Sequence, residues 1–228
     1  PDALIVAPSG TSTATCINRA IPALTYNLTA ATGATITNLP VGLSVLIPAG
    51  AASSTIGNVI TISGLTNSST LTLTGIATVA GVRNYTITAT GICEPSTITG
   101  TITVNPDASI ATPSGTSTAT CINTAIPSLT YNFSAATSAT IIGLPAGLSV
   151  NVPVGVSSIT SGNMITISGL TNSSTITLTG VATVAGVSNY TITATGICDA
   201  NTITGTITIN PDALIVAPSG TSTATCIN

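Results

Sequence analysis

Few residues in this chain have side chains that can do chemistry, and they recur at a fixed spacing. The sequence of 228 residues contains 5 cysteines, 5 acidic residues, 2 basic residues and no histidine. Cys16 and Cys93 are followed, one repeat period later, by Cys121 and Cys198. Thiols can form disulfide bonds, and carboxylates can bind cations or transfer protons. Disulfide formation, metal binding and acid–base catalysis are therefore the chemistries to weigh.

Catalysis is disfavoured by the small number of titratable groups. General acid–base catalysis needs a group that titrates near neutral pH, and without histidine only isolated carboxylates remain. Asp2, Asp107 and Asp212 each follow a proline, whereas Glu94 and Asp199 each follow a cysteine. We expect a protein that is not an enzyme and that has no catalytic residues and no cofactor.

Metal binding is disfavoured for a similar reason. Two cysteines per repeat with no histidine cannot complete a tetrahedral zinc site. One carboxylate in each proline-containing connection is too few for calcium, which gathers about six to eight oxygen ligands. We expect no metal site and interpret these acids as solvated residues of the connections.

The spacing of the cysteines reflects a tandem repeat. Residues 211–228 are identical to residues 1–18, and residues 106–123 are a slightly altered copy, so the period is 105 residues. A period near 100 residues fits an autonomous domain. The predicted domains are residues 1–105, residues 106–210 and the start of a third repeat at residues 211–228, whose first strand forms a junction. Starting and stopping at equivalent points favours a piece of a longer array.

The cysteines are expected to form disulfide bonds, as in extracellular proteins. The most economical pairing is within each repeat, Cys16 with Cys93 and Cys121 with Cys198. A rival pairing joins Cys93 to Cys121, which would staple successive repeats. Cys226 is the first cysteine of the unfinished third repeat, so the odd count follows from where the sequence stops.

The composition excludes some partners and favours others. The net charge is −3 and only 3% of residues are charged, so there is no basic patch for nucleic acid. No apolar run reaches the roughly 20 residues that span a bilayer. Charge normally keeps soluble proteins apart, so its scarcity predicts self-association with neighbouring repeats or other copies of the chain. The alternative interpretation is compositional drift in an abundant extracellular protein built from small residues.

Alternating apolar and polar residues predict strands almost everywhere. In NYTITATG (84–91) one face carries Tyr85 and Ile87 while threonines occupy the other. The predicted strands of the first repeat are Ala3–Ala7, Ser12–Ile17, Leu24–Leu28, Ala34–Asn38, Asn58–Gly64, Ser69–Gly75, Asn84–Gly91 and Thr97–Val104. Segments rich in glycine, proline, asparagine and serine separate them, as in an all-β sandwich. Seven to nine short strands in about 100 residues predict tandem immunoglobulin-like β-sandwich domains.

Several motifs carry a resemblance to a known family. The order TATCINRAIPALTYNLTAATGATITNLPVGLSV, NVITISGL, GVRNYTITATGIC and STITGTITVNP resembles the Ig-like repeats of very long secreted and cell-surface proteins of Bacteroidetes. The NLPVGLSV, ITISG and YTITATG segments are also similar to Ig-like modules of bacterial surface proteins. The resemblance implies a secreted or surface-displayed adhesive or filament-forming protein. The segment LIPAGAASSTIG is longer than the pattern and is expected to be an inserted loop or an extra strand.

The connections and possible modification sites complete the expectations. The inter-repeat junctions are short Asn-Pro-Asp turns stiffened by proline. Three glycosylation sequons per repeat are weak signals in a chain so rich in threonine, and glycans are a further candidate partner. The junction residues are Asn105, Pro106, Asp107, Asn210, Pro211 and Asp212, and the sequon asparagines are Asn27, Asn67, Asn84, Asn132, Asn172 and Asn189.

The expected function is structural. The preferred hypothesis is a repeat segment of an extracellular filament or surface fibre. The alternative is a spacer or stalk of a large cell-surface adhesin that presents a distal binding domain. A third hypothesis, binding of ice or carbohydrate by threonine ladders such as Thr86, Thr88 and Thr90, is disfavoured because sandwich sheets twist.

Overall fold

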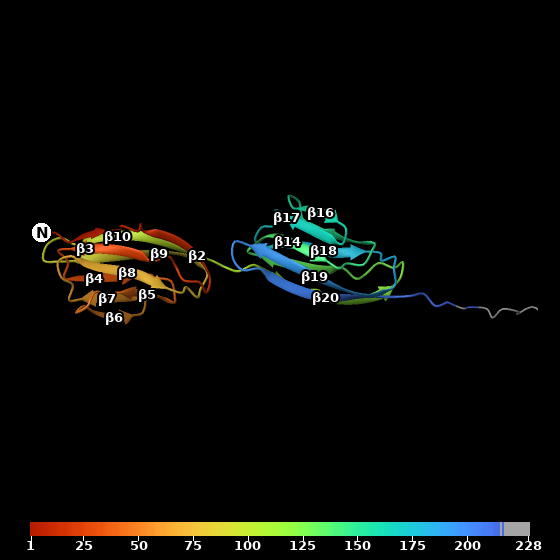
Figure 1. Cartoon of the computed structure of the whole chain (residues 1–228), viewed down its shortest axis with the longest axis horizontal. Coiled ribbons are helices and arrows are strands. Elements are labelled where there is room, and N and C mark those ends of the chain that lie inside the picture. Colours follow the sequence, from red (N-terminus) through yellow and green to blue (C-terminus); the bar gives the residue numbers. More distant parts are fainter. Residues whose placement is uncertain (215, 217–228) are drawn as a thin grey trace, which may run out of the picture. The chain divides into compact units, whose positions relative to one another are not determined.

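The computed structural model describes residues 1–214 and 216, and this part of the chain forms strands and no helix (Figure 1). Ten strands come from the first repeat: β1 (Leu4–Val6), β2 (Ser12–Cys16), β3 (Leu24–Thr29), β4 (Gly33–Thr37), β5 (Leu43–Leu46), β6 (Ala52–Ile56), β7 (Val59–Ser63), β8 (Ser69–Gly75), β9 (Gly81–Thr90) and β10 (Ser96–Asn105).

The second repeat forms the same series of strands. They are β11 (Ser109–Ala111), β12 (Ser117–Cys121), β13 (Leu129–Ser134), β14 (Ala136–Ile142), β15 (Leu148–Asn151), β16 (Ser157–Ser161), β17 (Met164–Ser168), β18 (Ser174–Gly180), β19 (Gly186–Gly196) and β20 (Asn201–Asn210). The predicted start of a third repeat, with its junction strand and Cys226, lies almost wholly outside the described residues.

Each repeat folds into two sheets. In the first repeat a four-stranded sheet has the order β1-β3-β8-β5, and a six-stranded sheet has the order β2-β10-β9-β4-β7-β6. The second repeat has the corresponding orders, β11-β13-β18-β15 and β12-β20-β19-β14-β17-β16. These orders contain the two sheets of the immunoglobulin sandwich, with the ABED order in the first and the CFG order in the second. The chain is therefore an all-β tandem of Ig-like sandwiches, as the sequence predicts.

Alternation of side chains places the core between the sheets. In β9 the residues Tyr85, Ile87 and Ala89 are fully buried, and in β10 Ile102 and Val104 are buried. The intervening threonines are partly or fully exposed. Because successive side chains of a strand point to opposite faces, each sheet contributes one apolar face to the core and one hydroxyl-rich face to solvent.

The strand predictions were right for eight segments and incomplete for two. The strand β5 was missed because it has only four residues and directly follows the Leu-Pro-Val-Gly turn. The segment expected to be an inserted loop or an extra strand contains β6, which forms a hairpin with β7 and lies at the edge of the six-stranded sheet. Every residue of β6 is exposed, so it carries no buried face for a sequence pattern to reveal.

A parallel pair of strands determines where the first cysteine of each repeat lies. The strand β2 runs parallel to β10, and Cys16 at its end is opposite Asn105 at the end of β10. The amide of Ile17 then donates to the carbonyl of Asn105 at 2.8 Å. Cys16 is therefore held beside the point where the first repeat ends and the connection to the second repeat begins.

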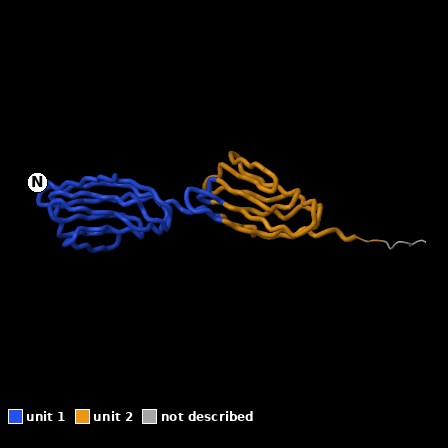
Figure 2. The backbone as a smooth tube through the Cα atoms, viewed as in Figure 1, with its two compact units in different colours: residues 1–109, 134–137, 194–201 blue, residues 110–133, 138–193, 202–228 orange. Residues whose placement is uncertain are grey.

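The compact units of the structure do not coincide with the sequence repeats (Figure 2). Unit 1 contains residues 1–109 together with two segments of the second repeat, 134–137 and 194–201. Unit 2 contains residues 110–133, 138–193 and 202–228. The segment 194–201 includes the loop between β19 and β20, so this loop of the second repeat belongs to unit 1.

Candidate functional site

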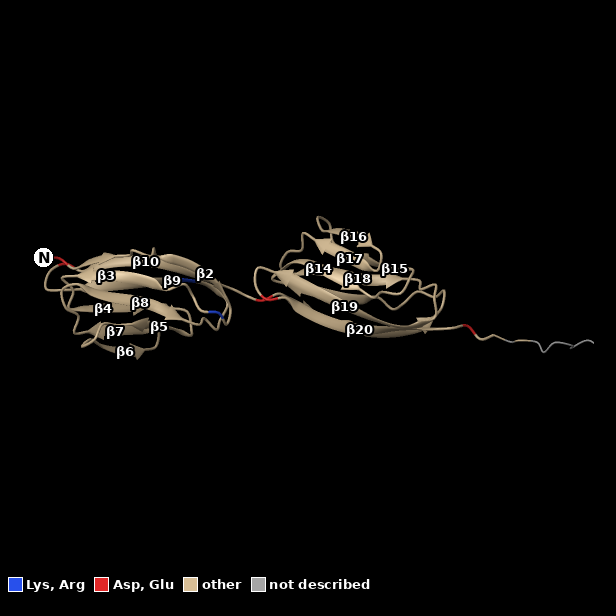
Figure 3. Ribbon diagram, in the orientation of Figure 1, with Lys and Arg blue, Asp and Glu red and all other residues tan. Residues whose placement is uncertain are grey.

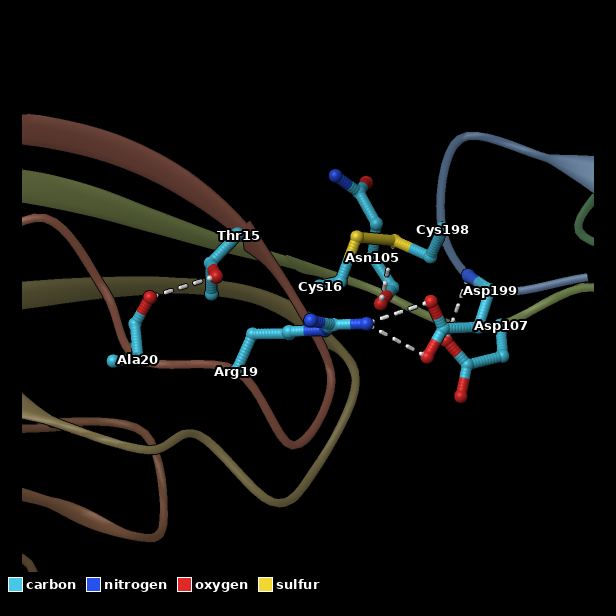
Figure 4. The surroundings of a disulfide bond; sticks show 8 residues. All are labelled: Thr15, Cys16, Arg19, Ala20, Asn105, Asp107, Cys198 and Asp199. Atoms are coloured by element: carbon cyan, nitrogen blue, oxygen red, sulfur yellow. Dashed lines mark hydrogen bonds and ion pairs between the residues drawn. A yellow bond between two sulfur atoms is a disulfide. The ribbon is translucent and has the colours of Figure 1, made fainter.

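A disulfide bond in unit 1 is the centre of the candidate site (Figure 4). It joins Cys16, the last residue of β2, to Cys198 in the loop between β19 and β20, with a Cα–Cα distance of 5.6 Å. The two residues are 182 positions apart in the chain. The bond thus connects the first cysteine of the first repeat to the second cysteine of the second repeat.

This connectivity corrects the prediction of one disulfide within each repeat. Cys93 precedes the start of β10, whereas Cys16 is opposite Asn105 at the other end of the same strand. Ten residues of extended strand span about 30 Å. Disulfide formation requires Cα atoms within about 7 Å, so the two cysteines of one repeat cannot meet.

The rival pairing of Cys93 with Cys121 is also wrong within this chain. Both residues are free, exposed cysteines. The bonded residues Cys16 and Cys198 are partly buried, although they occupy the same positions of the repeat as Cys121 and Cys93. The difference in exposure therefore accompanies the bond and does not come from the sequence around each cysteine.

Polar contacts surround the disulfide (Figure 4). The guanidinium of Arg19 donates to both carboxylate oxygens of Asp199, at 2.9 and 3.1 Å. The backbone amide of Asp199 donates to the carboxylate of Asp107 at 3.2 Å, and its carbonyl accepts from the amide of Ala108 at 3.0 Å. The Sγ of Cys198 lies 3.5 Å from the carbonyl oxygen of Asn105, a packing contact because a disulfide sulfur carries no hydrogen.

The ion pair adds little stability by itself. The side chains of Arg19 and Asp199 are each 63% exposed, and exposed pairs contribute between zero and about 1 kcal/mol. Both hydrogen bonds come from Nη2 of Arg19, and they hold the Asp199 carboxylate next to Cys198. Figure 3 shows how few residues of the described part of the chain are charged.

The predicted junction residues contribute to this site unequally. Asn105 and Asp107 contact the disulfide loop directly, and Pro106 connects them. At the end of the second repeat, the carbonyl of Asn210 accepts from the amide of Ile122 at 2.9 Å, as Asn105 does for Ile17. Pro211 and Asp212 follow β20 and are exposed.

Sequence reasoning missed a buried pair of tyrosines in each repeat. The hydroxyl of Tyr85 donates to the carbonyl of Thr11 at 2.6 Å and is hydrogen-bonded to the hydroxyl of Tyr26. Because a hydroxyl has one hydrogen, Tyr26 must donate to Tyr85. Burial raises the pKa of Tyr26 far above its usual value, and the hydrogen bond and charge of Tyr85 raise it further.

The second tyrosine of the pair is also shifted, and the arrangement recurs. Burial raises the pKa of Tyr85, while the hydrogen bond from Tyr26 lowers it in part. Tyr131 and Tyr190 form the same pair, with Tyr190 donating to the carbonyl of Thr116 at 2.6 Å. The space beside Tyr85 requires Gly100, since a Cβ there would lie 1.9 Å from the oxygen of Thr11. The signal in the sequence was two inward tyrosines and a glycine within a strand.

The sequon asparagines are exposed, and most of them are engaged in hydrogen bonds. Asn67 accepts from the amide of Ala30 at 2.9 Å, and Asn84 accepts from the hydroxyl of Thr101 at 2.9 Å. Asn27, Asn132 and Asn189 accept from the hydroxyls of neighbouring threonines, and Asn172 is also exposed. Glycosylation at these positions stays a prediction.

The described residues offer no other assembled chemistry. Among residues 1–214 and 216, no three cysteine, histidine or acidic side chains gather closely enough to hold a metal ion. No helix in this part of the chain is suited to crossing a membrane. A hollow of about 340 Å³ next to Cys93 is lined by apolar and uncharged side chains, including Ala31, Leu65 and Ile92.

Comparisons with known proteins give distant structural likenesses. No protein-family model and no curated protein sequence matches the chain. The titin A168–A169 structure is 12% identical with a TM-score of 0.42, and the match covers 90% of this chain and 98% of the titin chain. The titin I-band fragment I67–I69 is 9% identical with a TM-score of 0.46, covering 91% of this chain and 66% of its own.

A bacterial structure is similar to a comparable degree. The C-terminal domain of the Streptococcus agalactiae AgI/II polypeptide BspA is 6% identical with a TM-score of 0.40, and the match covers 91% of this chain and 99% of that one. The assignment of each repeat to the Ig-like sandwiches follows from its own strand order.

Proposed function

We propose that this chain is a non-enzymatic structural segment of an extracellular filament or surface fibre. The observation that carries the proposal is the disulfide between Cys16 and Cys198, which fastens one repeat to the next. Disulfides persist in oxidising compartments, so the bond supports a location outside the cytosol. The resemblance to bacterial secreted and surface repeats supports the same location.

The position of the bond suits a segment that bears tension. A force applied at the two ends follows the shortest covalent path, which runs from residue 16 to residue 198 through the disulfide. The strands β3 to β19 lie between these residues and are therefore outside the path of the force. A bond within one repeat would leave the connection between repeats as the only covalent link.

The surface supports association with other copies. The strands β6 and β16 lie at the edges of their sheets and are exposed along their whole length. They carry no charged residue and no proline, the features that usually prevent an edge strand from pairing with another chain. A net charge of −3 adds little repulsion between copies.

Electron microscopy of the native material, imaged with and without reductant, tests the proposal. We expect long fibres with a repeat of about 35–45 Å, estimated from strands of about ten residues and a turn. Reduction should loosen the fibres without dissolving the individual sandwiches. Short single tethers that end in a distinct globule would contradict the filament and favour the stalk of a large adhesin.

A further inference from the structure

We propose that Cys121 of one copy of this chain forms a disulfide with Cys93 of a second copy, so that copies join head to tail. The inference rests on the proposed function, because it extends the bond seen between repeats to a bond between chains. Its starting point is that the two free, exposed cysteines are the ones equivalent to the two bonded cysteines.

The position of Cys121 is built like that of Cys16. Cys121 is the last residue of β12, and β12 runs parallel to β20. Cys121 lies opposite Asn210, as Cys16 lies opposite Asn105. The next residue donates to the same carbonyl in both repeats, at 2.9 Å for Ile122 and 2.8 Å for Ile17. The thiol of Cys121 is therefore presented at the end of the second repeat as Cys16 is at the end of the first.

The position of Cys93 is built like that of Cys198. Each lies in the loop between the last two strands of its repeat, and each is followed by an acidic residue. The loop is held by the same backbone hydrogen bond, from Ala3 to Glu94 in the first repeat and from Ala108 to Asp199 in the second, both at 3.0 Å. Cys93 is thus placed to bond with Cys121 of a second copy as Cys198 bonds with Cys16.

The two ends are different, which decides the form of the assembly. A bond between Cys121 and Cys93 is heterologous, and each bonded pair of copies retains one free Cys93 and one free Cys121. Addition can therefore continue without limit. A bond between two Cys93 residues or two Cys121 residues would be symmetric and would use up that end.

The chemistry balances with a small-molecule disulfide as the oxidant. The thiolate of Cys121 attacks one sulfur of oxidised glutathione, forming a mixed disulfide and releasing one glutathione. The thiolate of Cys93 from the second copy attacks the Cys121 sulfur of the mixed disulfide and releases the second glutathione. The two cysteines lose two electrons and two protons, which leave on the two glutathione thiols.

One contact of the observed site is missing at the proposed one. Arg19 contacts Asp199, but the residue equivalent to Arg19 in the second repeat is Thr124, which would face Glu94 of the second copy. The bond between copies would therefore form without an ion pair. An arginine at position 124 would restore the ion pair. It should affect a bond formed by docking of the two copies and should not affect random oxidation of exposed thiols.

The experiment oxidises the purified full chain, carrying Cys226→Ser, in a buffer of reduced and oxidised glutathione. We expect a concentration-dependent ladder of covalent oligomers on a non-reducing gel, with peptide mapping that joins Cys93 to Cys121. Cys93→Ser and Cys121→Ser are matched single variants, and each should stop the ladder at the dimer or below. A chain that stays monomeric, or dimers joined only by Cys93–Cys93 or Cys121–Cys121 bonds, would overturn the inference.

Charge variants at one position separate docking from chance oxidation. Thr124→Arg should accelerate ladder formation at low salt by up to about five-fold, and added salt should remove the gain. Thr124→Glu should slow it. Equal rates for both variants would mean that the two ends do not meet in the geometry of the Cys16–Cys198 site.

Failure of this inference can be distinguished from failure of the proposed function. Native fibres that lack a Cys93–Cys121 bond would leave the filament in place and remove the bond between copies. A ladder of covalent oligomers from the purified chain, together with short single tethers in the native material, would support the bond between copies and contradict the filament.

Discussion

At the residue scale, the tyrosine pair is the polar feature on which each sandwich depends. The hydrogen bonds run from Tyr26 to Tyr85 and from Tyr85 to the carbonyl of Thr11, among the apolar side chains of the core. A buried hydroxyl without an acceptor costs about 1–3 kcal/mol, so the two tyrosines of a pair are not equivalent. Removing the hydroxyl of Tyr85 leaves the hydroxyl of Tyr26 without an acceptor. Removing the hydroxyl of Tyr26 leaves no donor without an acceptor.

We predict that two double variants lose different amounts of folding stability. Tyr26→Phe with Tyr131→Phe should lower the free energy of unfolding by about 1 kcal/mol per repeat. Tyr85→Phe with Tyr190→Phe should lower it by about 2–3 kcal/mol per repeat, because Tyr26 and Tyr131 then lack an acceptor. Urea unfolding followed by circular dichroism measures both. Equal losses would contradict the direction assigned to the hydrogen bonds.

The same tyrosines predict the response to alkaline pH. Their pKa values are raised in the folded protein above the ordinary value of 10.0, so the unfolded chain releases these protons at a lower pH than the folded chain does. Stability is therefore complete below pH 10 and falls as the pH rises further, by up to about 1.4 kcal/mol per pH unit for each tyrosine.

A titration of the urea midpoint between pH 8 and pH 12 measures this loss. Tyrosinate absorbance near 295 nm should appear together with unfolding and not before it. Absorbance that develops while the circular dichroism is still native would show that the hydroxyls ionise within the folded sandwich, contrary to their burial.

At the element scale, the exposed edge strands are the features on which the proposed association between copies depends. Ile56 in β6 and Ile159 in β16 are 81% and 66% exposed, so lysine at these positions should change folding stability by less than about 0.5 kcal/mol. Because a charge on an edge strand opposes pairing with another chain, Ile56→Lys with Ile159→Lys should reduce lateral association. Sedimentation of concentrated protein measures the effect.

The matched control places the same charge away from the edge strands β6 and β16. Val82 in β9 and Val187 in β19 are 65% and 68% exposed, and two strands of the same sheet lie between β9 and β6 and between β19 and β16. Val82→Lys with Val187→Lys should leave association closer to that of the unchanged protein. An equal reduction in both pairs would mean that net charge, and not the edge strands, controls association.

At the scale of the whole molecule, the disulfide limits how far the chain can be stretched. With the Cys16–Cys198 bond intact, only residues 1–16 and 198–228 can extend, which is about 160 Å at 3.5 Å per residue. After reduction the whole chain can extend to about 800 Å. The physical reason is that the bond carries the force past every residue between the two cysteines.

Single-molecule stretching from the two ends measures these lengths directly. Before reduction we expect only the strands outside the bonded interval, β1, β2 and β20, to detach, and after reduction one unfolding event per repeat. Cys16→Ser should behave like the reduced chain, whereas Cys121→Ser should behave like the oxidised one. Extension beyond about 160 Å without reductant would show that the bond is not between Cys16 and Cys198.

The sequence by itself determined the architecture and the inventory of chemistry. The alternation of apolar and polar residues in segments such as Asn84–Gly91 predicts strands. The 105-residue repeat predicts two similar sandwiches in succession. The lack of histidine led to the prediction of a protein without acid–base catalysis. These properties depend on local side-chain order and composition, which the sequence records directly.

Only the tertiary structure decided which groups meet. The partner of Cys16 could not be read from spacing, because the parallel register of β2 with β10 puts Cys16 and Cys93 at opposite ends of one strand. The contact of Tyr26 with Tyr85 depends on how two sheets face each other across the core. The strand β6, exposed on both faces, left no apolar alternation for the sequence to display. Each of these features arises from pairing across long separations, and a one-dimensional pattern contains no record of it.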